Sequence, residues 1–137
     1  MLMNSGMDFT LMKALIIDDN DFVRFMLEKH LMGFGFENVA QASDGHAGLE
    51  ILKEQKPDIV ICDINMRPVN GYEFLKQVRL LETELSSVPV IFLTSKADEA
   101  FVKRAIELNI DGYLLKPVMP TFLKKHITMI LEDKMTA

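Results

Sequence analysis

Five polar residues of this chain have types and positions that suit the chemistry of a phosphoryl group. Each comes directly after a short, largely apolar run of the kind that forms a buried strand. They are Asp18, Asp19, Asp63, Thr94 and Lys116. Taken singly, each has an ordinary explanation as a helix cap, a turn former or a solvated loop residue. Their common position at the ends of apolar runs favours a shared site instead.

The chemistry of such a site follows from the charges. Three carboxylates packed together repel one another, and burial raises their pKa values. A hard cation with oxygen ligands relieves both effects, and Mg²⁺ is the natural candidate because it is commonly held by one or two carboxylates, waters and a phosphate. Lys116 supplies a positive charge for a phosphoryl oxygen, and Thr94 supplies a hydroxyl donor. A carboxylate nucleophile, a metal, a cation and a donor together match phosphoryl transfer.

The elements that position these residues alternate along the chain. Strands are predicted at 14–17, 36–42, 58–62, 88–93 and 112–115. Helices are predicted at about 21–32, from Asp44 to before Pro57, after the loop 65–71, from Asp98, and from Pro120. Asn109 stands where the fourth helix should end, and asparagine tolerates the left-handed turn that such ends often use. This alternation predicts an α/β fold, with a five-stranded parallel sheet covered by five helices on its two faces.

The strand order determines whether the five polar residues meet. A flavodoxin-like order, 2-1-3-4-5, reverses between the first and third strands, and open α/β sheets bind ligands at the carboxyl edge beside such a reversal. With that order, Asp18, Asp19 and Asp63 meet at the reversal point. The sequence thus predicts an acidic site at one edge of the sheet.

Composition limits the classes of protein to consider. With 137 residues and 49% apolar residues, the chain fits one globular domain. The predicted boundaries are a flexible lead at 1–12, the domain at 13–133 and a tail at 134–137. The net charge of −5 argues against direct nucleic-acid binding. The single cysteine, Cys62, suits a reducing compartment, and no apolar run reaches the roughly 18 residues of a membrane span. A cytoplasmic location is therefore expected, with no membrane contact.

Four motifs in chain order resemble the receiver domains of bacterial response regulators, including the single-domain regulators of chemotaxis. The resemblance spans roughly residues 13–132. Its segments are Ala14 to Asn20 (ALIIDDN), Asp58 to Asp63 (DIVICD) with Gly71 eight residues later, Ile91 to Ser95 (IFLTS), and Gly112 to Pro117 (GYLLKP).

The resemblance implies a role for each site residue. Asp63 is the expected phosphoacceptor. Asp19 and Asp63 are expected to coordinate Mg²⁺, which Mn²⁺ can replace, with the backbone carbonyl of Asn65 as a further ligand. Asp18 is expected to act through metal-bound water, Lys116 and Thr94 to contact the phosphoryl group, and Thr94 with Tyr113 to form the switch.

The resemblance also implies partners. A histidine kinase or a histidine phosphotransfer protein of a phosphorelay is expected to supply the phosphoryl group, and a downstream protein target to read the result. The chain is expected to be a switch that assists its own phosphorylation and dephosphorylation, not a turnover enzyme. One departure from the family pattern is the order Met66-Arg67-Pro68, in which proline stands one place late. That change alters the loop and leaves the chemical groups in place.

Two other classes of protein remain as alternatives. A phosphatase of haloacid-dehalogenase type also uses an aspartyl nucleophile, but its D-x-D motif follows the first strand, whereas Asp63-Ile64-Asn65 follows the third and lacks the second acid. A flavin-binding electron carrier needs a Ser/Thr/Gly-rich phosphate loop after the first strand. This chain has Asp18-Asp19-Asn20-Asp21 there, which repels phosphate unless a metal is bound.

Overall fold

The computed structural model describes residues 7–95 and 99–136. The elements are β1 (Lys13–Ile17), α1 (Asp21–Phe34), β2 (Asn38–Ala42), α2 (Gly45–Gln55), β3 (Ile59–Asp63), α3 (Gly71–Arg79), the 3₁₀ turn η1 (Glu84–Ser87), β4 (Val90–Thr94), α4 (Glu99–Ile106), β5 (Gly112–Leu115) and α5 (Pro120–Thr136). The alternation predicted from the sequence is confirmed. Asp98, the predicted first residue of the fourth helix, lies outside the described residues.

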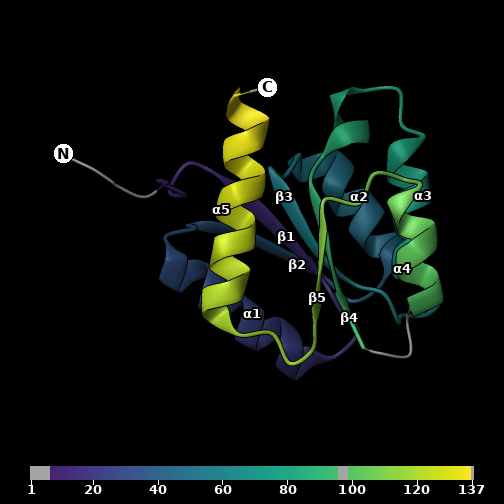
Figure 1. The fold of residues 1–137 in the computed structure, drawn as a ribbon, viewed down its shortest axis with the longest axis horizontal. Helices are drawn as coiled ribbons and strands as arrows, with labels where there is room; N and C mark the ends of the chain where they lie inside the picture. The colour runs from purple at the N-terminus through teal and green to yellow at the C-terminus, as the bar shows by residue number, and fades with distance from the viewer. Residues whose placement is uncertain (1–6, 96–98, 137) are drawn as a thin grey trace.

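The five strands form one sheet in the order β2-β1-β3-β4-β5, and every neighbouring pair is parallel. The predicted flavodoxin-like order is therefore confirmed. Ile17 pairs with Cys62, and Asp63 pairs with Leu93. This register brings the carboxyl ends of β1, β3 and β4 to one edge of the sheet, which is the lower edge in Figure 1.

Helices cover both faces of the sheet (Figure 1). One apolar cluster joins α1 and α5 to the face that carries Ile16, Ile61 and Ile91. The other joins α2, α3 and α4 to the face that carries Ile17, Cys62 and Phe92. All residues of β3 and β4 are buried. Burial on both faces explains why these strands are nearly continuous apolar runs.

Side-chain caps fix where the helices begin. Asn20, Asp44 and Asn70 each precede a helix and accept a hydrogen bond from a backbone N–H of its first turn. The cap predicted at Asp44 is confirmed, and Asn70 adds a capping box with Glu73. Such caps satisfy N–H groups that have no partner within the helix.

Left-handed residues mark three of the described helix ends, and one of them is Lys56, with φ 50° at the end of α2. Asn109 has φ 58° just after α4, as predicted, and Gly35 has φ 119° at the end of α1. Gly33, one residue past the predicted end of this helix at residue 32, lies inside α1. A glycine inside a helix is tolerated at a cost of about 1 kcal/mol, so α1 continues until Gly35 provides a left-handed cap.

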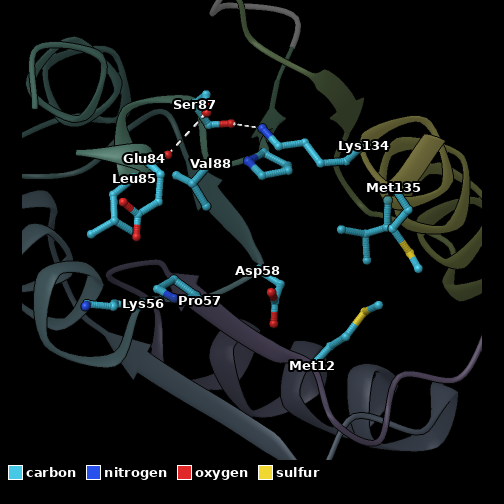
Figure 2. Close-up of a pocket in the computed structure, with 12 residues that line it drawn as sticks. Met12, Lys56, Pro57, Asp58, Glu84, Leu85, Ser87, Val88, Lys134 and Met135 are labelled. Carbon is cyan, nitrogen blue, oxygen red and sulfur yellow. Dashed lines mark hydrogen bonds between the residues drawn. The ribbon is translucent and has the colours of Figure 1, made fainter. Parts of the chain in front are cut away.

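Met7, Phe9 and Met12, in the segment predicted as a lead, pack against the domain. The ring of Phe9 stacks on the ring of Phe36 with 4.6 Å between centroids, and Phe9 is buried. Phe36, predicted as the start of the second strand, lies just before β2 instead. Met12 reaches a hollow of about 400 Å³ at the sheet edge opposite the acidic residues, where it lies near Met135 of α5 (Figure 2).

Arg79 ties the end of α3 to the segments that precede β4 and β5. Its guanidinium donates to the backbone carbonyls of Ser86, Val88, Leu108 and Asn109 and pairs with Asp111 at 3.2 Å. Two of those carbonyls lie just after α4, where a helix leaves acceptors without partners. Arg79 therefore fixes the C-terminal end of α4 relative to the sheet.

Candidate functional site

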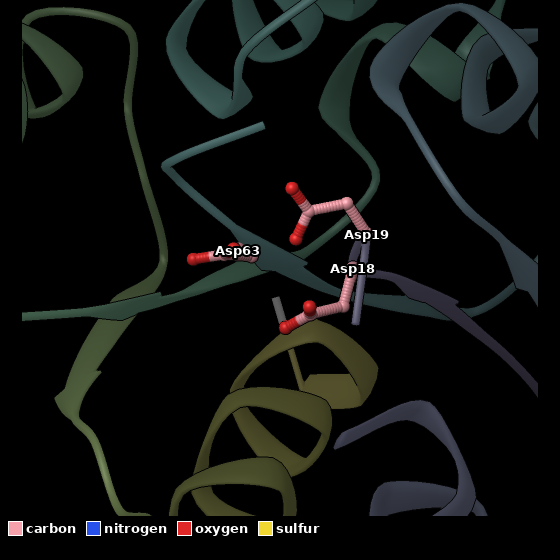
Figure 3. Close-up of side chains that lie close together, drawn as sticks. All are labelled: Asp18, Asp19 and Asp63. Atoms are coloured by element: carbon pink, nitrogen blue, oxygen red, sulfur yellow. The ribbon is translucent and has the colours of Figure 1, made fainter. Parts of the chain in front are cut away.

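The three carboxylates predicted to meet do meet. Asp18 and Asp19 follow β1, and Asp63 is the last residue of β3 on the adjacent strand. One carboxylate oxygen from each lies within 4.8 Å of those of the other two (Figure 3). Asp18 and Asp63 are buried, whereas Asp19 is exposed. The cluster is therefore a partly open acidic pocket.

Local hydrogen bonds hold the segment that carries Asp18 and Asp19. The Asp18 N–H donates to the carbonyl of Ala42 at 3.1 Å, which continues the pairing of β1 with β2. The Asn20 N–H donates to Asp18 Oδ1 at 2.9 Å, and the Asn20 side chain in turn caps α1. The strand end and the helix start thus fix the acidic turn between them.

Lys116 reaches this pocket from the end of β5. Its Nζ lies 3.0 Å from Asp63 Oδ1 and 3.4 Å from Asp18 Oδ2. Its backbone N–H donates to the carbonyl of Thr94 at 2.8 Å, which extends the pairing of β4 with β5. Burial alone would lower the pKa of Lys116, but the hydrogen bond to Asp63 and the charges of both carboxylates outweigh it and raise that pKa. Lys116 is therefore a fixed cation at neutral pH.

The environment of Asp63 disfavours its charged form. Burial raises the pKa of its carboxyl group, and the nearby charge of Asp18 raises it further. The hydrogen bond and charge of Lys116 act in the opposite direction, as does the Asn65 N–H at 3.4 Å from Oδ1. Three carboxylates and one ammonium leave an excess of negative charge. This oxygen donor set fits a hard divalent cation.

The loop after β3 approaches Asp63 so closely that only glycine fits at one position. A Cβ atom at Gly71 would lie 2.6 Å from the Asp63 carbonyl oxygen and 2.8 Å from Ile64 Cα. The Gly71 N–H donates to the Ile64 carbonyl at 2.8 Å, which closes the loop onto the start of α3. In this loop the peptide bond between Arg67 and Pro68 is cis. The loop thereby sets the position of the Asp63 backbone.

Thr94 and Tyr113, the predicted switch pair, line one hollow. Thr94 is buried, and its hydroxyl donates to the carbonyl of Ser95 at 3.1 Å. Tyr113 lies on the edge strand β5 and is 50% exposed. A hollow of about 320 Å³ lies between them, bordered also by Glu99 and Val102 of α4.

One residue at the site was not found from the sequence. The Arg24 guanidinium, on the second turn of α1, donates to the Asp18 backbone carbonyl at 2.6 Å. An arginine on a helix face gives no sequence signal for this contact, because the contact depends on the angle at which the helix leaves the turn. The carbonyl of Asn65 as a metal ligand stays a prediction.

Comparison with known proteins identifies the family. The family model described as the response regulator receiver domain matches residues 14–128. Chemotaxis protein CheY-3 of Vibrio cholerae is 35% identical over 88% of this chain and 92% of its own length. Chemotaxis protein CheY of Pseudomonas aeruginosa is 34% identical over 88% of this chain and 97% of its own length.

Comparison with solved structures gives the same family. A response regulator receiver domain protein from Clostridium thermocellum superimposes with a TM-score of 0.84 at 28% identity, over 92% of this chain and 98% of its own. None of these comparisons supports the phosphatase alternative. Among the described helices, none combines the length and the apolar character needed to cross a membrane. The chain belongs to the response regulator receiver domains, which are phosphoacceptor switches of signal transduction.

Proposed function

We propose that Asp63 is the phosphoacceptor of this receiver domain. The position of Lys116 Nζ, 3.0 Å from Asp63 Oδ1 beside two further carboxylates, carries the proposal. Two of the three acids, Asp18 and Asp63, pair with this fixed cation, and the contact of Asp63 is the shorter one. Phosphoryl transfer depends mainly on positioning and on neutralising charge at the transferring oxygens, and this arrangement supplies both.

The same acids hold the metal in this proposal. Asp19 and Asp63 bind Mg²⁺ directly, Asp18 through water, and the backbone carbonyl of Asn65 completes the protein ligands, with Mn²⁺ as a substitute. When bound, the ion neutralises negative charge on the phosphoryl oxygens and on the carboxylates. The excess negative charge of the cluster supports this assignment, because Lys116 supplies one positive charge against three carboxylates.

In the transfer itself, an Asp63 carboxylate oxygen forms a bond to phosphorus as the bond from phosphorus to the donor histidine nitrogen breaks. The electron pair of that bond stays on the imidazole nitrogen. The Lys116 ammonium pairs with the Asp63 carboxylate before the transfer and with a phosphoryl oxygen after it. Water later hydrolyses the acyl phosphate, which returns Asp63 to its free state and releases phosphate. In this proposal the domain assists both its phosphorylation and its dephosphorylation.

The donor is a protein histidine, because receiver domains of response regulators interact with histidine kinases. An apolar hollow of about 420 Å³ borders Lys116 and is lined on α1 by Phe22 and Met26, and beyond β5 by Pro117 and Val118. Phe22 is 68% exposed. This apolar surface supports docking of the kinase or phosphotransfer protein beside the acceptor.

The switch in this proposal couples Thr94 to Tyr113. A phosphoryl group brings strong acceptor oxygens to the end of β3. The Thr94 hydroxyl leaves the Ser95 carbonyl and donates to one of them, which draws the loop after β4 inward. The half-exposed Tyr113 then turns into the hollow that borders Thr94. The surface formed by α4, β5 and α5 changes as a result, and a downstream protein target reads that change.

Intact-mass analysis after incubation with acetyl phosphate and Mg²⁺ tests the acceptor. The wild type should gain one phosphoryl group that is stable in acid and labile in base, and Asp63→Asn should gain none. Asp58→Asn is the matched control: it lies at the opposite end of β3, and its side-chain oxygen can still accept the Lys13 N–H. Labelling that persists in Asp63→Asn at the wild-type level would place the acceptor elsewhere.

A further inference from the structure

Arg24 links the helix α1 to the turn that carries two of the three carboxylates. Its Nη1 donates to the backbone carbonyl of Asp18 at 2.6 Å, and its Nη2 pairs with the Asp21 carboxylate. The Arg24 side chain is 17% exposed, whereas that of Asp21 is 92% exposed. The buried part of the interaction is therefore the one with the Asp18 backbone.

The Asp18 carbonyl has a geometric role in the acidic pocket. It belongs to the planar peptide that joins Asp18 to Asp19, so its direction sets the direction in which the chain enters Asp19. The Asp18 N–H is already held by the Ala42 carbonyl at 3.1 Å. With Arg24 on the carbonyl, the backbone is fixed on both sides of the Asp18 side chain.

Charge alone would make Arg24 unfavourable for a bound cation. A guanidinium near the acidic pocket repels a divalent ion, and removing it would tighten ion binding. Positioning predicts the opposite sign, because loss of the contact frees the Asp18–Asp19 peptide and spreads the carboxylates. Arginine suits the positioning role because its planar fork donates in two fixed directions at once.

We propose that Arg24 is a positioning residue for the metal site: it holds the Asp18–Asp19 peptide so that both carboxylates face Asp63. Arg24 contacts neither the ion nor the phosphoryl group. The inference rests on the proposed function, in which Asp18, Asp19 and Asp63 hold Mg²⁺. Groups that orient metal ligands in this way typically change metal affinity 10- to 100-fold when they are mutated.

Mg²⁺ titration of the full chain, followed by amide NMR, tests the proposal. Arg24→Met should bind Mg²⁺ about tenfold more weakly than the wild type. Arg24→Lys keeps the charge but loses the fork, and it should also bind more weakly. Lys29→Met removes an exposed positive charge from the same helix without touching the turn, and it should stay within about twofold.

A second measurement separates positioning from general loss of structure. The rate of labelling by acetyl phosphate in Arg24→Met should fall at low Mg²⁺ and recover at saturating Mg²⁺, which a misfolded domain would not do. Should Arg24→Met fail to fold, Arg24→Lys decides the matter. Wild-type or tighter Mg²⁺ affinity in the folded arginine variants overturns the inference. Absence of Mg²⁺ binding in the wild type overturns the proposed function instead.

Discussion

At the scale of single residues, Asp63 combines a functional requirement with a cost in stability. Its carboxylate must be accessible to a phosphoryl donor and yet lies among buried groups, and burial raises its pKa above the ordinary value of 3.8. A raised carboxyl pKa means that folding favours the protonated form. Ionised Asp63 therefore destabilises the fold, despite its pairing with Lys116, until a second cation binds.

The first prediction concerns the pH dependence of this cost. As pH rises, the unfolded chain releases the Asp63 proton first and the folded chain later, so the stability contributed by this group falls between the two pKa values and stays low above both. In Mg²⁺-free buffer at pH 7, Asp63→Asn should therefore unfold a few degrees higher than the wild type. Thermal unfolding measured by circular dichroism checks this.

The difference in unfolding temperature between the wild type and Asp63→Asn should disappear at about pH 3, where Asp63 is protonated in the folded and the unfolded wild type. Added Mg²⁺ should also narrow it at pH 7, because a ligand of the folded state stabilises that state. An Asp63→Asn variant that is less stable than the wild type at pH 7 without metal would contradict the prediction.

The second prediction compares two glycines. Gly71→Ala places a Cβ 2.6 Å from the Asp63 carbonyl oxygen, and a backbone shift must relieve the clash. We expect a loss of roughly 1–3 kcal/mol, as for other overpacked sites, together with slower labelling of Asp63. Gly33→Ala is the control, because its Cβ would meet nothing within 4 Å inside α1. It should stabilise the domain by about 0.4–1 kcal/mol.

Urea denaturation of both glycine variants gives the two free energies of unfolding. A neutral Gly71→Ala with wild-type labelling would show that the loop after β3 yields easily. The position of the Asp63 backbone would then not depend on the close contact at Gly71.

At the scale of elements, the two ends of α4 have different surroundings. Arg79 fixes the C-terminal end of α4, whereas the N-terminal end lies beside the hollow that borders Thr94 and Tyr113. Movement of this region is therefore expected at the start of α4 rather than at its end. Packed interiors tend to change between discrete arrangements, which favours a two-state response.

The third prediction tests this coupling. Thr94→Ala should still accept a phosphoryl group at Asp63 but lose most of the response at Tyr113, because the hydroxyl that draws the loop inward is gone. The measurement is the set of amide NMR shifts on α4, β5 and α5, with and without the phosphoryl mimic beryllofluoride. A full wild-type response around Tyr113 in this variant would rule out the proposed route.

The sequence predicted elements well where local pattern determines them. The buried strands β3 and β4 appear as apolar runs, and Asp44 and Asn109 mark helix ends through their own chemistry. The sequence did not show η1, the stacking of Phe9 on Phe36 or the contacts of Arg79. Each of these depends on residues brought together by the sheet, and such contacts leave no periodic pattern in the chain.

The site shows the same division. Asp18, Asp19, Asp63 and Lys116 were predicted to meet because parallel strands with a known order place their carboxyl ends at one edge. Arg24 was missed because its contact depends on the direction of a helix relative to a turn. The reacting groups can therefore be identified from the sequence more readily than the groups that hold them in place.

At the scale of the whole molecule, the two edges of the sheet have separate roles. The acidic pocket occupies the carboxyl edge, and the packing of residues 7–12 lies away from it. The fourth prediction is that Phe9→Ala lowers the free energy of unfolding by about 3 kcal/mol, in the range for buried phenylalanines. Labelling of Asp63 under folding conditions should stay at the wild-type rate.

Chemical denaturation and intact-mass analysis of the same Phe9→Ala sample measure both quantities. Leu11→Ala is the control, because Leu11 is 91% exposed in the adjoining turn and should change stability by less than about 0.5 kcal/mol. A wild-type stability for Phe9→Ala would show that residues 7–12 are dispensable to the domain.

Met12, just before β1, and Met135, near the end of α5, line the same hollow (Figure 2). The fold therefore begins and ends in one place, and its chain nearly forms a closed ring. A Gly/Ser linker from Met135 back to Met7 would close the ring and keep Phe9 in the chain, and new ends opened in an exposed loop would leave the sheet order unchanged. Opening the ring between α2 and β3, for example, would make β3 the first strand to leave a ribosome. Such circular permutants offer a way to ask whether the order of synthesis matters to a fold whose acidic pocket is assembled from strands far apart in the sequence.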